Sequence, residues 1–400
     1  MSEHTSLLKD PVSLEPEKAR GMMMTGLGVG GLLLLVSIAG GLATDKDQFF
    51  FSWLTGFAYV TTITLGLLFF TLIQHVVAAR WSVVVRRLAE AAIANIPLLI
   101  VYFIPVLMGM HSLYHWTHED VATDAILAAK SPYLNVPFFL IRAAIFLGAW
   151  TIIGQFFFKN SVRQDTEGGH ELTLKMRRIA APSLFVFALT LTFSGIDWFM
   201  SLDPHWYSTI FGPYMFAGSA VSSFSMLVFL TRRVQANGGL LHSVNQEHFH
   251  DLGKLMFAFT VFWTYIGFSQ YFLIWYSNIP EETIWFLHRW NSGWKTISLM
   301  LPVCHFVIPF VALLSRYPKR NPAFLTVMAV WILVMHYVDM YWLIMPTHHP
   351  ENPHFHWLDI TTVLGMVGVW YGLWAWRLTR VAVLPVQDPL LPESLEFQNV

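Results

Sequence analysis

The chain has 400 residues, of which 55% are hydrophobic and 12% are charged. Soluble globular proteins average roughly 25% charged residues, so water is not the main solvent of this protein. The formal net charge of -1 gives no sign of a nucleic-acid partner. The single cysteine, Cys304, excludes an internal disulfide and an iron–sulfur cluster held by this chain alone.

Apolar runs long enough to cross a bilayer follow one another along the chain. A spanning helix needs about 20 mainly apolar residues, and these runs lack the alternation of barrel strands. The first run is longer than the apolar core of a signal peptide, so we expect it to be retained. The predicted fold is all-α, with transmembrane helices at 22–43, 51–79, 90–111, 135–158, 178–200, 209–231, 255–276, 295–315, 323–345 and 357–378.

Lysine and arginine follow the alternation expected of ten spans with both termini in the cytoplasm, because cytoplasmic loops carry their excess. Of the 24 lysines and arginines, five fall in segments assigned to the outer side and the remaining nineteen in inner segments. The five are Lys46, Lys130, Arg142, Arg289 and Lys295. We therefore expect a cytoplasmic N-terminal segment (1–21), a transmembrane domain (22–380), a cytoplasmic C-terminal tail (381–400) forming a surface strap, and a bacterial inner-membrane location.

Tryptophan and tyrosine gather near the outer helix ends, as expected of rings that anchor at the membrane interface. We interpret this belt as anchoring and do not assign ligand-binding roles to its rings. Its members are Trp198, Trp206, Tyr207, Trp275, Tyr276, Trp285, Trp290, Trp294, Tyr341, Trp342 and Trp357.

Four polar residues in the outer halves of the predicted spans form the main candidate site: Arg142, Asp197, His336 and Asp339. An ionisable side chain inside a membrane is costly, so each is a functional hypothesis. In one interpretation Arg142 pairs with Asp197 or Asp339 and locks the bundle. In the other, a carboxylate and His336 accept protons from a quinol that enters near the outer face.

Further polar residues are candidates for a proton relay: His305, His75, Glu90, Gln155, Asp203 and His205. His305 and His336 have matching depths, so a b-type haem between them is an alternative. The histidine-rich loop 348–356 lacks a fixed ligand spacing, and we predict no metal site in the chain. No Walker loop, dinucleotide fingerprint or HExxH motif is present.

A long stretch between the fifth and sixth predicted spans carries a family resemblance. It runs from Phe193-Ser-Gly-Ile-Asp-Trp-Phe-Met-Ser-Leu-Asp-Pro-His-Trp-Tyr207 to Gly212-Pro-Tyr214. The chain resembles the NrfD/polysulfide-reductase-type membrane subunits of alternative complex III, a bacterial quinol:cytochrome c oxidoreductase. Its length and the Asp-Trp-Phe-Met-Ser-Leu-Asp-Pro form resemble the smaller of the two paralogous ten-helix subunits, for which a proton-translocating role has been proposed and a working quinol site is less certain.

The resemblance implies two four-helix bundles and two peripheral helices. It implies menaquinol or ubiquinol as reductant, and partner subunits on the outer face that carry iron–sulfur clusters and c-type haems. It further implies a paralogous membrane subunit and an attached oxidase or cytochrome c as acceptor. No group covalently bound to this chain is expected.

We therefore expect an integral membrane subunit of a respiratory or photosynthetic quinol oxidoreductase, active as part of that enzyme and contributing quinone binding or a transmembrane proton path. Two alternatives remain open. A secondary transporter could use the same polar residues as a central site, and would work as an isolated chain. A purely structural scaffold would tolerate neutralisation of Asp197 or Asp339.

Overall fold

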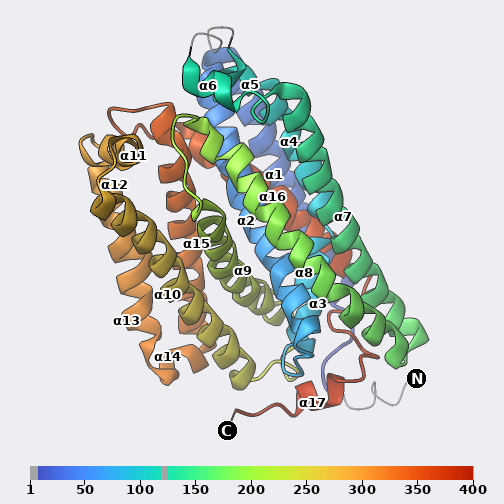
Figure 1. Ribbon diagram of the computed structural model, residues 1–400. Helices are drawn as coiled ribbons and strands as arrows, with labels where there is room; N and C mark the ends of the chain where they lie inside the picture. The colour runs from blue at the N-terminus through green and yellow to red at the C-terminus, as the bar shows by residue number, and fades with distance from the viewer. Residues whose placement is uncertain (1–7, 119–123, 400) are drawn as a thin grey trace.

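The computed structural model describes residues 8–118 and 124–399, and residues 1–7, 119–123 and 400 lie outside it. The described ranges contain helices and no strand, and ten helical segments are long and apolar enough to cross a membrane (Figure 1). These segments are α1 (Pro16–Thr44), α2 (Lys46–Val76), α3 (Val83–Ile93) with α4 (Ile96–Met108), α7 (Val136–Glu167), α8 (His170–Trp198), α9 (Phe211–Ala236), α10 (Gln246–Ser277), α12 (Lys295–Leu301) continuing into α13 (Ile308–Leu314), α15 (Pro322–Ile344) and α16 (Trp357–Leu378). The all-α prediction with ten spans is confirmed.

Short helices complete the two ends of the molecule. The end that carries α17 (Leu391–Leu395) is called the basic end, because Arg86, Arg87 and Arg377 lie near it. The opposite end is called the outer end, and α6 and α11 lie there in Figure 1. The remaining elements are α5 (Met110–Leu113), α6 (Ala125–Lys130), α11 (Pro280–Trp290), α14 (Arg316–Arg320) and the 3₁₀ turns His115–Thr117, Met200–Leu202 and Met345–Thr347.

The spanning helices form two groups of four with a pair outside them. The first bundle contains α2, α3 with α4, α7 and α8; the second contains α9, α10, α12 with α13, and α15 (Figure 1). Helices α2 and α9 pack against each other and join the bundles. Each is 89% buried over its most apolar window, so neither presents a broad face to lipid. The expected arrangement of two bundles and two peripheral helices is therefore present.

The outside pair, α1 and α16, is joined through glycines. A Cβ at Gly30 would lie 2.5 Å from the backbone nitrogen of Val369, and one at Gly26 would lie 2.7 Å from Cα of Gly372. Small residues let two helix backbones approach this closely inside a membrane. Helix α1 packs mainly on α16 and exposes Leu32 and Leu35.

Helix ends extend beyond the apolar runs that predict them. Helix α1 begins at Pro16, inside the segment expected to precede the first span, because proline suits the first turn of a helix. Helix α10 begins at Gln246, where Asn245 and His248 form a capping box. Polar first turns therefore lengthen helices that hydropathy alone would start later.

Two predicted spans are interrupted. The third breaks between α3 and α4 at Ala94–Asn95, where Pro97 has no N–H to donate to the carbonyl of Ile93. The eighth contains a π-helical turn, Pro302–Val307, between α12 and α13. This turn carries His305, which is completely buried.

The C-terminal tail crosses the basic end of the bundles instead of lying loosely on the surface. Leu384, Asp388, Leu391 and Ser394 are completely buried. Val383 donates a backbone hydrogen bond of 2.9 Å to Val12. The expected strap therefore exists over its described residues 381–399, and it is packed into the fold.

Candidate functional site

Asp339 on α15 is a fully buried carboxyl group held by two neutral donors. The Trp263 indole nitrogen of α10 donates to Oδ2 over 3.0 Å, and the Tyr214 hydroxyl of α9 donates to Oδ1. No described cationic side chain pairs with it. Buried carboxylates are normally paired with a cation, so an unpaired one beside neutral donors is a candidate for a functional site.

His336 lies one helical turn from Asp339, as predicted. Its Nε2 is 2.8 Å from the Thr62 hydroxyl of α2. A Cβ at Gly218 would lie 3.1 Å from Cε1 of the ring, so α9 packs tightly against this edge. His336 is thus a relay candidate next to Asp339, with one ring nitrogen already engaged.

His305 is close to both residues. Its ring centroid is 4.2 Å from that of Trp263 and 6.5 Å from that of His336. Neither of its ring nitrogens has a hydrogen-bond partner among the described residues. The haem alternative stays a prediction, and the structure places the Thr62 hydroxyl on Nε2 and α9 against Cε1 of the His336 ring.

Arg142 and Asp197 form a separate group in the first bundle. Arg142 Nε is 2.6 Å from Asp197 Oδ2, Nη2 is 3.2 Å from Oδ1, and Nη1 donates to the Tyr133 carbonyl over 2.9 Å. The guanidinium also lies 3.8 Å from the centre of the Tyr133 ring. Of the two partners expected for Arg142, the structure selects Asp197, and the pair holds α7 to α8.

The four residues expected to form one outer site therefore belong to two sites. No described hydrogen bond or ion pair joins the pair Arg142–Asp197 to Asp339 or His336. Their positions along the predicted spans place them at a similar depth in the membrane. Depth in the membrane does not determine which of the two bundles a helix joins.

The inner relay candidates are engaged in a buried ion network. Glu90 accepts hydrogen bonds from Arg86 (3.0 Å), Arg87 (3.3 Å) and the Ser161 hydroxyl, and His75 Nε2 lies 3.8 Å from it. Two further carboxylates complete the network, since Arg87 also pairs with Asp165 and Arg86 with Asp388 of the tail. These contacts bind α2, α3, α7 and the tail together.

Gln155 lies apart from that network. Its amide donates to the Ala94 carbonyl over 2.9 Å, at the break between α3 and α4. Arg377 donates to the same carbonyl over 2.6 Å. Both side chains therefore satisfy backbone that the interrupted helix leaves unpaired.

Asp203 and His205 lie outside the spanning helices. His205 Nε2 is 2.6 Å from Asp124 Oδ2, and this hydrogen bond lowers the pKa of Asp124. The Asp203 side chain makes no hydrogen bond or ion pair with a described residue. Neither residue forms a hydrogen bond with Asp339 or with its donors Tyr214 and Trp263. The hydrogen-bonded group around Asp339 therefore does not continue through Asp203 or His205.

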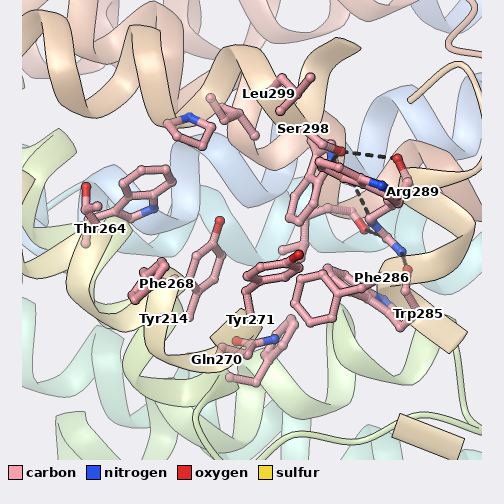
Figure 2. Close-up of a pocket in the computed structure, with 18 residues that line it drawn as sticks. Tyr214, Thr264, Phe268, Gln270, Tyr271, Trp285, Phe286, Arg289, Ser298 and Leu299 are labelled. Carbon is pink, nitrogen blue, oxygen red and sulfur yellow. Dashed lines mark hydrogen bonds between the residues drawn. The ribbon is translucent and has the colours of Figure 1, made fainter. Parts of the chain in front are cut away.

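A pocket of about 340 Å³ lies beside Asp339, between α9, α10, α11, α12 and α15. Its wall is open on the membrane-facing side, where Phe268 is 60% and Leu299 is 50% exposed. Tyr214 and Trp263, the two donors to Asp339, are part of the lining (Figure 2). The lining is dominated by aromatic rings: Phe211, Tyr214, Trp263, Phe268, Tyr271, Trp285, Phe286, Trp290 and Trp342.

Arg289 of α11 forms one side of this pocket. Its guanidinium is 3.4 Å from the centre of the Trp285 ring and donates to the carbonyls of Trp285 and Leu343, each over 3.1 Å. Burial lowers the pKa of Arg289 to about 9, so the group remains a cation at neutral pH. No described carboxylate pairs with it.

The pocket was missed by the sequence analysis. Trp285, Trp290 and Trp342 were interpreted as interfacial anchors, and Tyr214 was noted only as the end of a motif. Gln270, a pocket residue inside an apolar span, was also missed, although the comparable residue Gln155 is among the relay candidates. Its polarity inside such a span was the available signal.

Neither a scan against protein-family models nor a search of curated proteins finds a match for this chain. The resemblance drawn from the stretch 193–214 therefore remains a prediction. The ten helices establish a multi-pass membrane protein by length and hydropathy. Among the described residues, no group of three or more His, Cys, Asp or Glu side chains is placed to hold a metal ion.

Proposed function

We propose that this chain is a quinol-binding membrane subunit of a quinol oxidoreductase. The observation that carries the proposal is the aromatic pocket, because two of its lining residues hydrogen-bond a buried, unpaired carboxyl group. Quinol oxidation needs an apolar slot for a flat ring and a proton acceptor within hydrogen-bond reach of a ring hydroxyl. Both requirements are met at Tyr214 and Asp339.

The pocket suits a quinone ring in size and access. Ligand pockets of about 300–1,000 Å³ hold molecules of this size, and apolar linings with a few polar groups are typical of them. The exposed side chains Phe268 and Leu299 lie where an isoprenoid tail would continue into lipid. A ring that stacks among tryptophans gains contact area and excludes water from the reacting hydroxyl.

Tyr214 connects the pocket to Asp339. Its hydroxyl oxygen can accept a hydrogen bond from a quinol hydroxyl while its own proton is donated to Oδ1 of Asp339. A proton leaving the quinol would pass to Tyr214 as the Tyr214 proton passes to Asp339. Tyr214 is then unchanged and Asp339 is protonated.

Each quinol releases two protons and two electrons. The Tyr214–Asp339 pair accepts protons one at a time, and His336, one turn away, is the next ionisable side chain. The electrons require a one-electron acceptor of the haem or iron–sulfur class on a partner subunit at the outer face. Bacterial inner-membrane location and the paralogous membrane subunit belong to the same proposal.

A comparison of two buried carboxyl groups tests this proposal. Asp339→Asn should reduce quinol-dependent reduction of the electron acceptor by about 100-fold in the purified complex, because the amide cannot accept the proton. Asp359→Asn is the matched control, since Asp359 is also buried and bonded to neutral donors, Gln48 (3.0 Å) and Ser52 (2.5 Å), but does not line the pocket. It should retain turnover.

Two results would contradict the proposal. Full turnover in Asp339→Asn would favour a purely structural role for this chain in the complex. A chain that purifies without redox partners and transports a solute by itself would instead be a secondary transporter.

A further inference from the structure

Gln270 is a largely buried residue whose side-chain amide is a candidate for binding a ligand in the pocket. It lies on α10, is 6% exposed, and lines the aromatic pocket together with Tyr214 (Figure 2). No described residue forms a hydrogen bond with its side chain. By contrast Thr264, another polar residue in the lining, has a partner within its own helix, because it donates to the Thr260 carbonyl over 3.1 Å. The amide nitrogen and oxygen are not fully enclosed and keep accessible surface at the pocket, where a ligand can supply the hydrogen bonds that such polar groups normally make.

The position of Gln270 on α10 gives the pocket a second polar end. Trp263, Gly267 and Gln270 succeed one another at helical spacing, so they share one face of α10. A Cβ at Gly267 would lie 3.4 Å from Cε2 of Tyr214, so the Tyr214 ring is seated between the other two. At a rise of about 1.5 Å per residue, Gln270 is roughly 10 Å nearer the outer end than Trp263.

The Tyr214 hydroxyl and the Trp263 indole both donate to Asp339, so the rise from Trp263 to Gln270 approximates the distance between the two polar ends of the pocket, and a para-quinone has a comparable length. Its two oxygens lie on opposite sides of one six-membered ring, and a hydrogen bond of about 2.8 Å at each end brings the total span to roughly 10 Å. One oxygen would meet the Tyr214 hydroxyl, which is bonded to Asp339, and the other would meet Gln270.

We propose that Gln270 is the second hydrogen-bonding anchor of the ring in this pocket. The inference rests on the proposed function and assigns the ligand to the para-quinones. A side-chain amide carries both donors and an acceptor. It can therefore donate to a quinone carbonyl and accept from a quinol hydroxyl, and it binds both redox states without taking a proton. Gln270 is a positioning residue, and Asp339 remains the proton acceptor.

Ligand binding to the purified complex tests this inference without measuring turnover. The probe is a short-chain naphthoquinone, and its binding is followed by quenching of tryptophan fluorescence, because Trp263, Trp285 and Trp290 line the pocket. We expect Gln270→Leu, which keeps the side-chain volume, to weaken binding about fivefold to tenfold, the loss expected for one hydrogen bond. Infrared difference spectra with a ¹³C-carbonyl-labelled probe should show one carbonyl band shifted to higher frequency.

Controls separate this inference from the proposed function. Gln74→Leu makes the same change at another buried amide, on α2 and outside the pocket lining, and should leave the affinity and the carbonyl bands unchanged. A naphthol with a single oxygen should lose less affinity than the quinone when Gln270 is replaced. If the unaltered protein binds no quinone, the proposed function and the role of Gln270 both fail. If it binds, and Gln270→Leu has the same affinity and spectrum, the role of Gln270 alone is overturned.

Discussion

At the scale of single residues, the neighbours of Asp339 distinguish it from the other buried carboxyl groups of the described spanning helices. Glu90 and Asp197 are each paired with arginine and Asp251 is paired with Lys254, and such pairs hold their charges in place. Asp359 is bonded to Ser52 and Gln48 but is enclosed between α2 and α16. Asp339 combines neutral donors with a pocket on the other side of those donors.

Tyr214→Phe tests the connection between the pocket and Asp339. Loss of the hydroxyl should reduce quinol turnover by about 100-fold, because it removes the hydrogen-bonded route for the proton. It should lower the free energy of unfolding by only about 1–2 kcal/mol, since one buried hydrogen bond is lost. Steady-state kinetics and thermal unfolding of the same preparation measure both effects.

Tyr337→Phe is the matched control for this substitution. The Tyr337 hydroxyl donates to the Asp359 carbonyl over 2.6 Å, and the residue is not part of the pocket lining. Its turnover should equal that of the unaltered protein. Equal turnover in both variants would exclude Tyr214 from the proton route.

At this scale the sequence predicts which side chains can exchange protons, but it does not predict which residues form hydrogen bonds with them. His336 and Asp339 share a helix face because they are one turn apart, and this relation could be predicted from spacing alone. The bonds from Trp263 and Tyr214 could not, because they join α10 and α9 to α15 across tertiary contacts. Neutral residues such as Gln270 gain a role only once the pocket is known.

At the scale of helices, hydropathy predicts the number and order of spans well and their ends less well. Polar first turns extend α1 and α10 beyond the apolar runs. The π-helical turn 302–307 was not predicted, although Pro302 and Pro309 flank it and proline interrupts the helical hydrogen bonds. That turn brings His305 against Trp263, so the missed feature belongs to the candidate site.

The packing of α1 on α16 gives a prediction at this scale. Gly30→Leu should separate the two helices, because even a Cβ at this position would lie 2.5 Å from the backbone of α16. We expect the melting temperature to fall by about 5 °C or more, from a loss of a few kcal/mol. Gly28→Leu is the control, as a Cβ there meets nothing within 4 Å.

Quinone binding should survive in both glycine variants, because α1 and α16 contribute no residue to the pocket. An unchanged melting temperature in Gly30→Leu would mean that α1 is not held by this close contact.

At the scale of the whole molecule, charge is distributed unevenly between the two ends. The basic end holds a network in which Arg86, Arg87 and Asp388 are almost completely buried. The outer end instead holds the aromatic pocket, with Arg289 as a cation that has no described acidic partner. The excess of lysine and arginine predicted the orientation of the helices, but it could not predict that the tail would return to neutralise Arg86.

The tail provides a prediction on stability. Asp388→Ala should lower the free energy of unfolding by about 3 kcal/mol, because it removes one partner from a buried ion pair. Glu393→Ala removes the partner of Arg80 in an exposed pair and should cost less than about 1 kcal/mol. Thermal unfolding in detergent compares the two, and equal effects would show that burial of the tail contributes little.

The central claim is that the pocket bounded by α9, α10, α11, α12 and α15 binds the quinone ring. Photolabelling with an azido-quinone, followed by peptide mapping, tests it most directly. The account predicts that the label attaches to peptides containing Trp263–Tyr271 and Trp285–Leu301, and that unlabelled quinone prevents it. Labelling confined to other helices, or unaffected by competing quinone, would contradict the account.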